Sequence, residues 1–419
     1  MLAETSREKA TFDFARSIVT RLREAGFEAY FAGGCVRDRL MGLVPQDYDV
    51  ATSAEPPAVQ EVFGRRRTMA VGAAFGVIMV KGSPEVGAVE VATFRRDLEY
   101  RDGRHPEGVV FSSAEEDAQR RDFTINGLFY DPLENRVIDF VGGREDIRRG
   151  VIRAIGDPRA RFGEDKLRLL RAVRFAARFA FSLDEATRQA IAEMAPEIAA
   201  VSAERIAGEM ERMLVDPGRR RAMELLRETG LAAVLLPELS GDDPQDRWAE
   251  NLAVLERLEA PSLPLALAAL LAGWVTPAGA RGICSRWRLS QANTRRVAWL
   301  LANRGLLPQA QSLPWSRLQS VVVDDRFEDL YVWEKVRARV RGEPHEAWSE
   351  PIRRRLAQPR ERLDPPPLIT GNDLIASGFC AGPRFALVLK RIREAQLDGS
   401  VATKAEALTL ARRLFDGEE

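Results

Sequence analysis

The chain has 419 residues, which is too long for one hydrophobic core and indicates about two to four domains. Its 62 basic and 62 acidic residues leave no net charge, so total charge neither requires nor excludes a nucleic-acid partner, because local clustering decides that. Three scattered cysteines and two histidines argue against a disulfide framework, a zinc enzyme and chemistry built on a Ser–His pair. The cysteine pattern favours a reducing, cytoplasmic environment.

The sequence shows neither an export signal nor a membrane anchor. Its N-terminus lacks the charged-then-apolar pattern of a signal peptide. The longest apolar stretch, residues 263–275, contains Pro264 and is shorter than the ~20 residues that a membrane-spanning helix needs. We therefore expect a cytoplasmic protein with no membrane contact.

The first 150 residues alternate between helical and strand periodicity. Residues 6–26 carry apolar side chains at helical spacing, and Gly26 ends the predicted helix. The later predicted elements are a strand (29–32), a helix (36–41), a strand (47–51), a helix (56–64) and three strands (68–71, 76–80 and 89–94). From residue 163 onward strand signals vanish and helical periodicity dominates. The pattern predicts an α+β head followed by a long all-α region.

A glycine turn and two aspartates form the first candidate site. Gly33 and Gly34 lie between a strand and a helix, where backbone N–H groups and the helix dipole favour a phosphate. Arg37, in the first helical turn, can reach the same anion. Asp47 and Asp49 are two apart on a predicted strand, so both carboxylates point to one face and can bridge metal ions ~3.5–4 Å apart. The plainer alternative is a turn followed by two solvated acids; the order and spacing together favour the metal site.

These residues belong to a longer pattern that resembles a known family. Gly33-Gly34-x-Val36-Arg37-Asp38, followed by Asp47-x-Asp49-x-Ala51-Thr52, is similar to the signature of the tRNA nucleotidyltransferase/poly(A) polymerase family, and to its bacterial class II branch in particular. Further blocks that agree with this family lie at residues 116–126, 139–146, 154–156 and 162–175. The resemblance is dense over residues 28–215, thins beyond them, and returns over residues 368–408.

The resemblance implies a domain order and an activity. It implies an α+β nucleotidyltransferase (polymerase-beta-like) head at residues 1–150, then an all-α neck (151–218) that selects the nucleotide, and a body (219–330) and tail (331–419) that bind tRNA. It implies Mg²⁺ as cofactor and CTP and ATP as substrates. The implied reaction adds C, C and A to the tRNA 3′ end by two-metal phosphoryl transfer with release of pyrophosphate. No obligate protein partner is implied.

The predicted neck helix carries a candidate pair for reading the base. Asp165 and Arg168 are three apart, so on a helix they would be neighbours. Aspartate only accepts hydrogen bonds and arginine only donates them, which fits the amino group and bare ring nitrogen of cytosine or adenine and rejects guanine and uracil. Arg171 and Arg174 continue this face and are candidates for binding the triphosphate or the neighbouring base. The plainer alternative is a solvated basic helix with an internal salt bridge.

Three further features of the head are open to more than one interpretation. Glu90 is a candidate third carboxylate at the metal site, although an outward-facing strand acid would show the same pattern. In the family, the position that matches Arg121 contacts nucleotide, whereas Asp122 and Asn126 either brace the fold or touch substrate. The polar, aperiodic residues 95–108 predict a mobile loop, and a similar loop in relatives that add all of CCA helps the switch to A.

Other functions remain as alternatives. A bacterial poly(A) polymerase shares the head motifs, but residues 65–76 depart from the arginine-rich pattern of that branch. Enzymes that add only CC or only A are the next alternatives. A non-catalytic RNA-binding protein is disfavoured by the presence of the residues that carry the chemistry, which are Asp47, Asp49, Arg121, Asp165 and Arg168.

Overall fold

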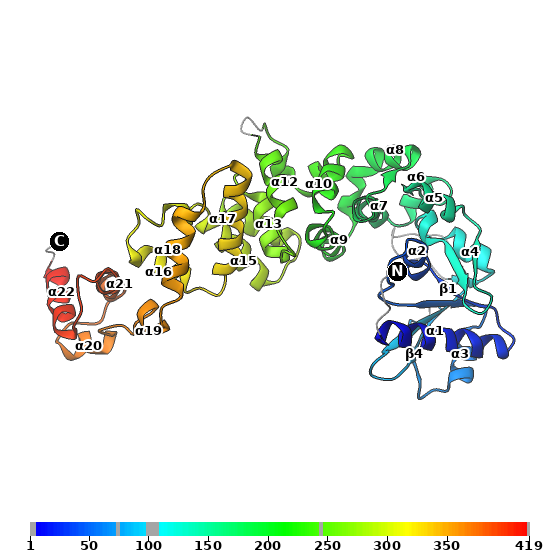
Figure 1. The fold of residues 1–419 in the computed structure, drawn as a ribbon, viewed down its shortest axis with the longest axis horizontal. Coiled ribbons are helices and arrows are strands. Elements are labelled where there is room, and N and C mark those ends of the chain that lie inside the picture. Colours follow the sequence, from blue (N-terminus) through cyan, green and yellow to red (C-terminus); the bar gives the residue numbers. More distant parts are fainter. Residues whose placement is uncertain (1–5, 73–75, 98–108, 243–245, 417–419) are drawn as a thin grey trace. The chain divides into compact units, whose positions relative to one another are not determined.

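The computed structural model describes residues 6–72, 76–97, 109–242 and 246–416. The chain forms two compact units, Met1–Gly241 and Asp242–Glu419, and each is described by itself. The first combines a sheet with helices, and the second is helical in its described part (Figure 1). The predicted class, an α+β head followed by a largely helical region, is confirmed.

A seven-stranded mixed sheet organises the first unit, in the order β3-β4-β5-β2-β1-β8-β9. Strands β2 and β5 are parallel, and the other neighbouring pairs are antiparallel. The strands are β1 (Ala29–Ala32), β2 (Asp49–Thr52), β3 (Thr68–Gly72), β4 (Val77–Lys81), β5 (Ala88–Thr93), β8 (Leu128–Asp131) and β9 (Arg136–Asp139). A separate pair, β6 (Arg95–Asp97) and β7 (Val109–Phe111), is antiparallel.

Both faces of the sheet are buried because successive side chains on a strand point in opposite directions. On one face Phe31 and Val50 pack with α1 (Ser6–Glu24) and α3 (Pro56–Phe63). On the other face Ala51 and Phe129 pack against α4 (Ala114–Gln119). Asp49 shares the parity of Ala51, and it therefore emerges on the second face, at the end of β2 where the sheet meets solvent.

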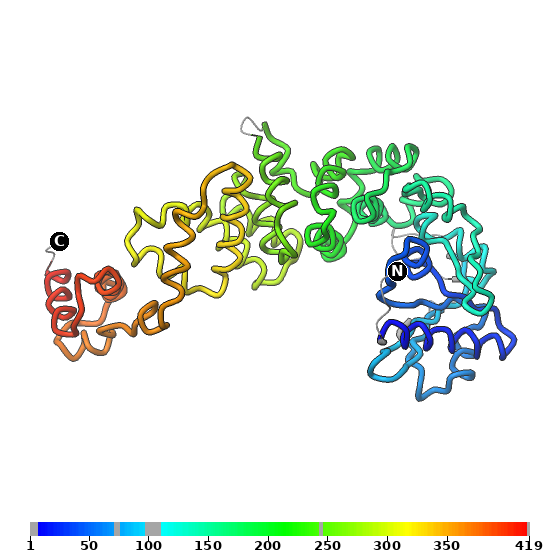
Figure 2. Tube along the Cα trace, in the orientation of Figure 1, coloured from blue at the N-terminus to red at the C-terminus, as the bar shows by residue number. Residues whose placement is uncertain are grey.

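Helix α7 (Leu167–Arg178) packs against α6, α9 and α10 and buries its apolar side chains there. The chain path through this region can be followed in Figure 2. The other helices are α2 (Gly34–Leu40), α5 (Gly143–Arg149), α6 (Pro158–Glu164), α8 (Glu185–Met194), α9 (Ala203–Val215), α10 (Arg219–Glu228) and α11 (Leu231–Leu235). Short 3₁₀ helices are η2 (Thr124–Asn126), η3 (Ala195–Ala200) and η4 (Pro237–Leu239).

The described part of the second unit is built from helices. They are α12 (Arg247–Arg257), α13 (Leu263–Leu271), α14 (Pro277–Arg286), α15 (Gln291–Asn303), η5 (Leu307–Gln309), α16 (Trp315–Val322), α17 (Phe327–Arg341), α18 (Glu346–Leu356), α19 (Arg360–Leu363), α20 (Gly371–Ala376), α21 (Arg384–Leu397) and α22 (Lys404–Asp416). Helix α13 is buried along its whole length, so the long apolar stretch of the sequence is a core helix. Over the described ranges, no helix has the length and apolar character needed to span a membrane.

Several predicted boundaries are corrected. Strand β2 begins at Asp49, so Asp47 precedes the strand that was expected to contain it. The region after residue 163, predicted to be all helical, contains a strand, because β11 (Ser182–Leu183) pairs in parallel with β10 (Val151–Ile152). Such two-residue strands are too short to leave a periodic signal in the sequence.

Two sequence interpretations concern longer segments. In the segment 95–108, predicted as a loop, the first three residues form β6, and residues 98–108 lie outside the described residues. Residues 219–241 pack within the first compact unit. The four-part division with boundaries near residues 150, 218 and 330 stays a prediction.

The start of α5 gives a stability prediction. A Cβ on Gly143 would lie 2.1 Å from the backbone oxygen of Thr124, so Gly143→Ala should destabilise the first unit by about 2–3 kcal/mol. The matched control is Gly208→Ala in the middle of α9, where a Cβ meets nothing within 4 Å; it should stabilise the unit by roughly 0.5–1 kcal/mol. Thermal unfolding monitored by circular dichroism measures both. Equal midpoints for the two variants would contradict the close approach at Gly143.

Candidate active site

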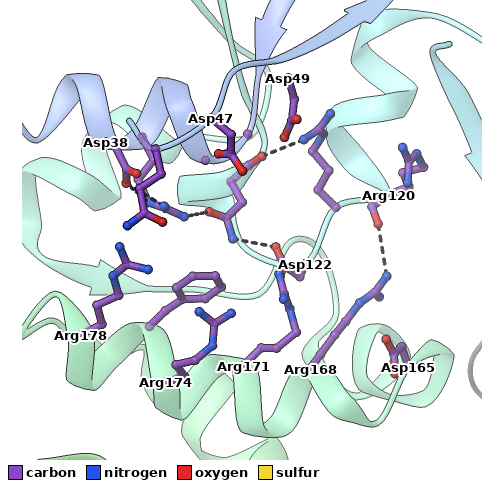
Figure 3. A pocket seen from close by; sticks show the side chains of 17 residues that line it. Asp38, Asp47, Asp49, Arg120, Asp122, Asp165, Arg168, Arg171, Arg174 and Arg178 are labelled. Atoms are coloured by element: carbon purple, nitrogen blue, oxygen red, sulfur yellow. Dashed lines mark hydrogen bonds and ion pairs between the residues drawn. The ribbon is translucent and has the colours of Figure 1, made fainter. Parts of the chain in front are cut away.

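One cavity of about 630 Å³ collects most of the residues that the sequence singled out. It lies within the first unit, between the glycine turn, the aspartates and helix α7 (Figure 3). Its lining comprises Gly33, Gly34, Arg37, Asp38, Gln46, Asp47, Asp49, Arg120, Arg121, Asp122, Asn126, Asp165, Arg168, Arg171, Arg174, Phe175 and Arg178. The structure thus brings together every predicted site residue except Glu90.

The glycine turn is shaped by its backbone and by a close neighbour. Gly33 has φ 70°, a conformation that favours glycine, and it caps the N-terminus of α2. A Cβ on Gly33 would lie 2.8 Å from Nη1 of Arg121, so a larger residue would also displace that guanidinium from the cavity. The turn therefore fixes both the start of α2 and the position of Arg121.

The two aspartates reach the cavity because the residue between them is buried. The ring of Tyr48 packs in the sheet core, 5.2 Å from the ring centroid of Phe31. Its neighbours Asp47 and Asp49 therefore point the other way, and both line the cavity although only Asp49 belongs to β2. The expectation that they share one face is confirmed.

The electrostatics at the aspartates favour a cation. Burial raises the pKa of Asp49 to about 7, and the negative charges of Glu90 and Asp47 add to this, while Arg121 opposes it. Across the described ranges, the carboxylates of Asp47, Asp49 and Glu90 form no ion pair and accept no hydrogen bond. Unpaired carboxylates facing a cavity are suitable ligands for Mg²⁺, which commonly uses one or two of them together with water and substrate phosphates.

Glu90 stands apart from the main cavity. It is the register partner of Asp49 on the neighbouring parallel strand, and it is exposed. Together with Asp49 it lines a second cavity of about 180 Å³. In the described part of the chain, no three histidine, cysteine, aspartate or glutamate side chains are close enough to form a metal site as a group. The part that Glu90 plays at the metal stays a prediction.

Asp165 and Arg168 line the cavity, but not as neighbours on one helix. Helix α6 ends at Glu164 and α7 begins at Leu167, so Asp165 lies in the break with an extended backbone (φ −147°, ψ 103°). That conformation turns its carboxylate toward α9, where Oδ2 accepts a 2.7 Å hydrogen bond from Arg205.

Arg168 has a different partner. Its Nη1 donates a 2.6 Å hydrogen bond to Oε2 of Glu164, which lies four residues earlier. The prediction that Asp165 and Arg168 are helical neighbours is therefore wrong. Their proposed role in reading the base does not depend on it, because both side chains still face the same space.

A chain of hydrogen bonds connects α7 with the head. Arg171 donates to Oδ2 of Asp122 at 2.6 Å, and Asn126 donates to Oδ1 of the same carboxylate at 2.9 Å. The amide oxygen of Asn126 accepts a 2.6 Å bond from Arg37, which also donates to Asp38 at 2.7 Å. Burial opposes ionisation of Asp122, but the Arg171 charge and these hydrogen bonds lower its pKa to about 2. The sequence did not decide whether Asp122 and Asn126 brace the fold or touch substrate. In the structure, both connect side chains of the cavity wall by hydrogen bonds.

Other predicted nucleotide contacts also have protein partners. Arg174 donates a 2.6 Å bond to the buried Glu209, and Arg121 donates to Asp117 at 2.9 Å. The guanidinium of Arg37 lies 4.7 Å from the ring centroid of Phe179. These arginines shape the cavity and contribute positive potential to it.

One arginine of the cavity was not predicted from the sequence. Arg178 lies one helical turn beyond Arg174, at the end of α7, and it is exposed. Its four-residue spacing from Arg174 could have predicted that it faces the cavity, because side chains three or four residues apart share a helix face.

Comparison with known proteins defines the class first. The sequence matches the family described as "Poly A polymerase head domain" over residues 29–153. It also matches "Probable RNA and SrmB- binding site of polymerase A" over residues 180–242. The first match covers the glycine turn, both aspartates and Arg121. Together with the cavity, it defines a nucleotidyltransferase with a poly(A) polymerase head.

Relatives that match over nearly the whole chain define the particular family. The chain is 37% identical over 410 residues to the CCA-adding enzyme of Geobacillus stearothermophilus, covering 96% of each chain. It is 32% identical over 406 residues to that of Lactobacillus johnsonii, covering 95% of this chain and 96% of the relative. The chain belongs to the family of CCA-adding enzymes, which are tRNA nucleotidyltransferases.

Solved structures agree with this assignment. The Bacillus stearothermophilus CCA-adding enzyme in complex with CTP superposes with a TM-score of 0.77 at 33% identity, covering 97% of this chain and 98% of that one. The Thermotoga maritima CCA-adding enzyme complexed with tRNA_CCA, at 21% identity, shares the fold with a TM-score of 0.65. The family resemblance in the sequence is confirmed.

Opposite effects on stability are expected from two carboxylates of this site. Burial, and after it the like charges of Glu90 and Asp47, raise the pKa of Asp49 to about 7, so its contribution to stability falls as the pH rises from about 4 to about 7. In metal-free buffer at pH 8, Asp49→Asn should therefore raise the free energy of unfolding by roughly 1–2 kcal/mol, discounted for partial exposure. The gain should vanish near pH 4.

Asp122→Asn is the control of opposite sign. It leaves Arg171 without its carboxylate and should lower the stability by about 2 kcal/mol at every pH above 4. Calorimetric unfolding at several pH values, with a chelator present, compares the two variants. A destabilised Asp49→Asn at pH 8 would show that Asp49 has a stabilising partner after all.

Proposed function

We propose that this chain adds C, C and A in turn to the 3′ end of tRNA, using CTP and ATP and releasing pyrophosphate. The proposal rests chiefly on near-full-length identity of 37% to a CCA-adding enzyme, combined with the cavity that holds the matching residues. A relative of 33% identity is solved in complex with CTP. The relatives' names favour CCA addition over the poly(A) polymerase alternative.

In this proposal Asp47 and Asp49 bind Mg²⁺, because their carboxylates face the cavity and have no partner among the residues that the structure describes. Bound there, the ion would activate the attacking hydroxyl and neutralise charge on the leaving group. The tRNA 3′ oxygen bonds to the α-phosphorus while the bond from that phosphorus to the bridging oxygen breaks. The hydroxyl proton is lost to solvent, and pyrophosphate departs.

The protein's own part is largely positioning. The backbone N–H of Gly33 donates to the carbonyl of Leu128 at 3.0 Å, which holds the turn against β8. The N–H of Gly34, at the start of α2, then faces the phosphates, and Arg121 beside the turn adds positive charge near Asp49. Arg171 and Arg174 are locked by Asp122 and Glu209, so they form a rigid basic wall. A wall that is already ordered needs no reorganisation when charge develops in the transition state.

Base selection is assigned to Asp165 and Arg168. Each is anchored from outside the cavity, by Arg205 and Glu164 respectively, and a carboxylate keeps lone pairs for further donors. The amino group of cytosine or adenine would donate to Asp165, and the bare ring nitrogen would accept from Arg168. Guanine and uracil present the reverse pattern, which leaves both protein groups unpaired.

The direct test offers the purified protein three tRNAs, ending before CCA, after C and after CC. Each is incubated with each labelled nucleotide in the presence of Mg²⁺. The proposal requires C, C and A incorporation in that order, with no extension beyond A. Incorporation limited to C or to A would identify a partial enzyme, and a long A tract would identify a poly(A) polymerase.

Asp47→Ala and Asp49→Ala should each reduce incorporation of both C and A by about 10³-fold or more, because the ligands that stabilise transition-state charge are lost. Binding of tRNA, measured by filter retention, should change little. Glu90→Ala, assayed in parallel, decides whether the third carboxylate contributes. Near-normal turnover of either aspartate variant in saturating Mg²⁺ would overturn the metal assignment.

Asp165→Ala should narrow the nucleotide preference. Removing the acceptor leaves the amino group of C or A unpaired, so kcat/KM for CTP and ATP should fall about ten- to hundredfold. UTP and GTP make no such bond and should lose less. Arg205→Gln keeps Asp165 but removes its anchor, so an intermediate loss is expected. An equal loss for all four nucleotides would show that the pair is structural.

A further inference from the structure

The cavity is lined by seven arginines, and six of them are paired with carboxylates. The nitrogen–oxygen distances of these pairs lie between 2.6 and 2.9 Å. The pairs are Arg37–Asp38, Arg120–Asp117, Arg121–Asp117, Arg168–Glu164, Arg171–Asp122 and Arg174–Glu209. The seventh is Arg178, for which the described residues provide neither a carboxylate nor a hydrogen-bond acceptor. Its charge is therefore available to a ligand.

An aromatic platform orients the Arg178 side chain. Its guanidinium carbon lies 5.4 Å from the ring centroid of Phe179. Phe179 in turn stacks on Phe175, with ring centroids 6.0 Å apart and planes within 5°, and Arg37 covers the same pair of rings. A cation–π contact uses the face of a guanidinium and leaves its N–H groups free to donate. Arg178 is thus pre-positioned but not neutralised.

The order of residues along α7 relates Arg178 to the base-reading groups. Arg178 follows Arg168 by ten residues, a distance of about 15 Å along a helix. In Figure 3, Asp165 and Arg178 occupy opposite ends of the row of arginines, and Asp47 lies on the facing side of the cavity. A nucleotide whose base lies at Asp165 would therefore place its polyphosphate past the aspartates, with its far end toward Arg178.

We propose that Arg178 binds the terminal phosphate of the incoming nucleoside triphosphate and, after the reaction, the pyrophosphate that leaves. This inference rests on the proposed function and adds a residue to it. Arg178 lines the same cavity as Gly34 and the two aspartates, so its guanidinium faces the space that would hold the polyphosphate. Asp38, which lies on the same side of the view as Arg178 in Figure 3, is already bonded by Arg37.

The test compares Arg178→Gln with the wild-type full-length chain. The KM for CTP and for ATP, and the inhibition constant of pyrophosphate, should each rise about tenfold, as expected for loss of one charged hydrogen bond. Inhibition by CMP, which lacks the terminal phosphates, and the KM for tRNA should stay unchanged. Arg178→Lys keeps the charge without the planar fork and should recover part of the loss.

Arg149→Gln is the matched control, because it removes one exposed arginine of α5 that does not line the cavity. It should leave all five constants unchanged. If Arg178→Gln raises only the KM for tRNA, the residue contacts RNA phosphate and the proposal is overturned. Unchanged constants would show that Arg178 is a solvated residue without a ligand contact. An equal loss of CMP affinity would show that Arg178 acts on the base or on the stability of the fold, and either result would overturn the proposal.

The two proposals can fail separately. If the wild-type chain incorporates neither C nor A, the proposed function fails. Calorimetric binding of CTP, pyrophosphate and CMP with Mg²⁺ still tests Arg178 in that case. A tenfold weaker affinity of Arg178→Gln for CTP and pyrophosphate, with CMP unaffected, supports the phosphate contact in the absence of turnover.

Discussion

The hydrogen-bonded connection from Arg171 through Asp122 and Asn126 to Arg37 is the constraint on which the rest of the site depends. It joins helix α7 to the turn that follows β1, two parts of the chain more than a hundred residues apart. Because both ends are fixed, the cavity between them has a fixed width. The side chains on its two walls therefore lie at defined distances from one another. A buried carboxylate with a strongly lowered pKa makes this connection costly to break.

Charges in this region divide into two kinds. Paired charges, such as Arg174 with Glu209, stabilise the fold and hold the cavity wall in a fixed geometry. Asp47, Asp49 and Arg178 have no ion-pair partner among the described residues, and they lie where a metal–nucleotide complex would supply one. Burial against like charge even makes Asp49 a source of strain in the free protein. The groups proposed to meet the metal and the terminal phosphate are thus different from those whose ion pairs order the cavity wall.

Local pattern was enough to predict most of the head. The strand before Gly33, the turn itself and the opposite orientation of Tyr48 follow from periodicity and glycine chemistry, and all are present. The break at Asp165 was not predictable, because its partner Arg205 lies 40 residues away and only packing brings them together. The same holds for Asp122 and Arg171, 49 residues apart. Sequence therefore located the site, while side-chain partners required the tertiary structure.

The buried pair of Arg174 and Glu209 has a consequence for how this family can vary. The two residues are 8% and 1% exposed and lie on different helices, so losing Glu209 leaves Arg174 as an unpaired interior charge, at a cost of about 3–5 kcal/mol. Exchanging both at once for apolar side chains of similar volume can be nearly neutral. Descendants of this sequence are therefore expected to keep both or to replace both. Arg212 pairs with the other oxygen of Glu209 from an exposed position, so its loss costs less than that of Arg174.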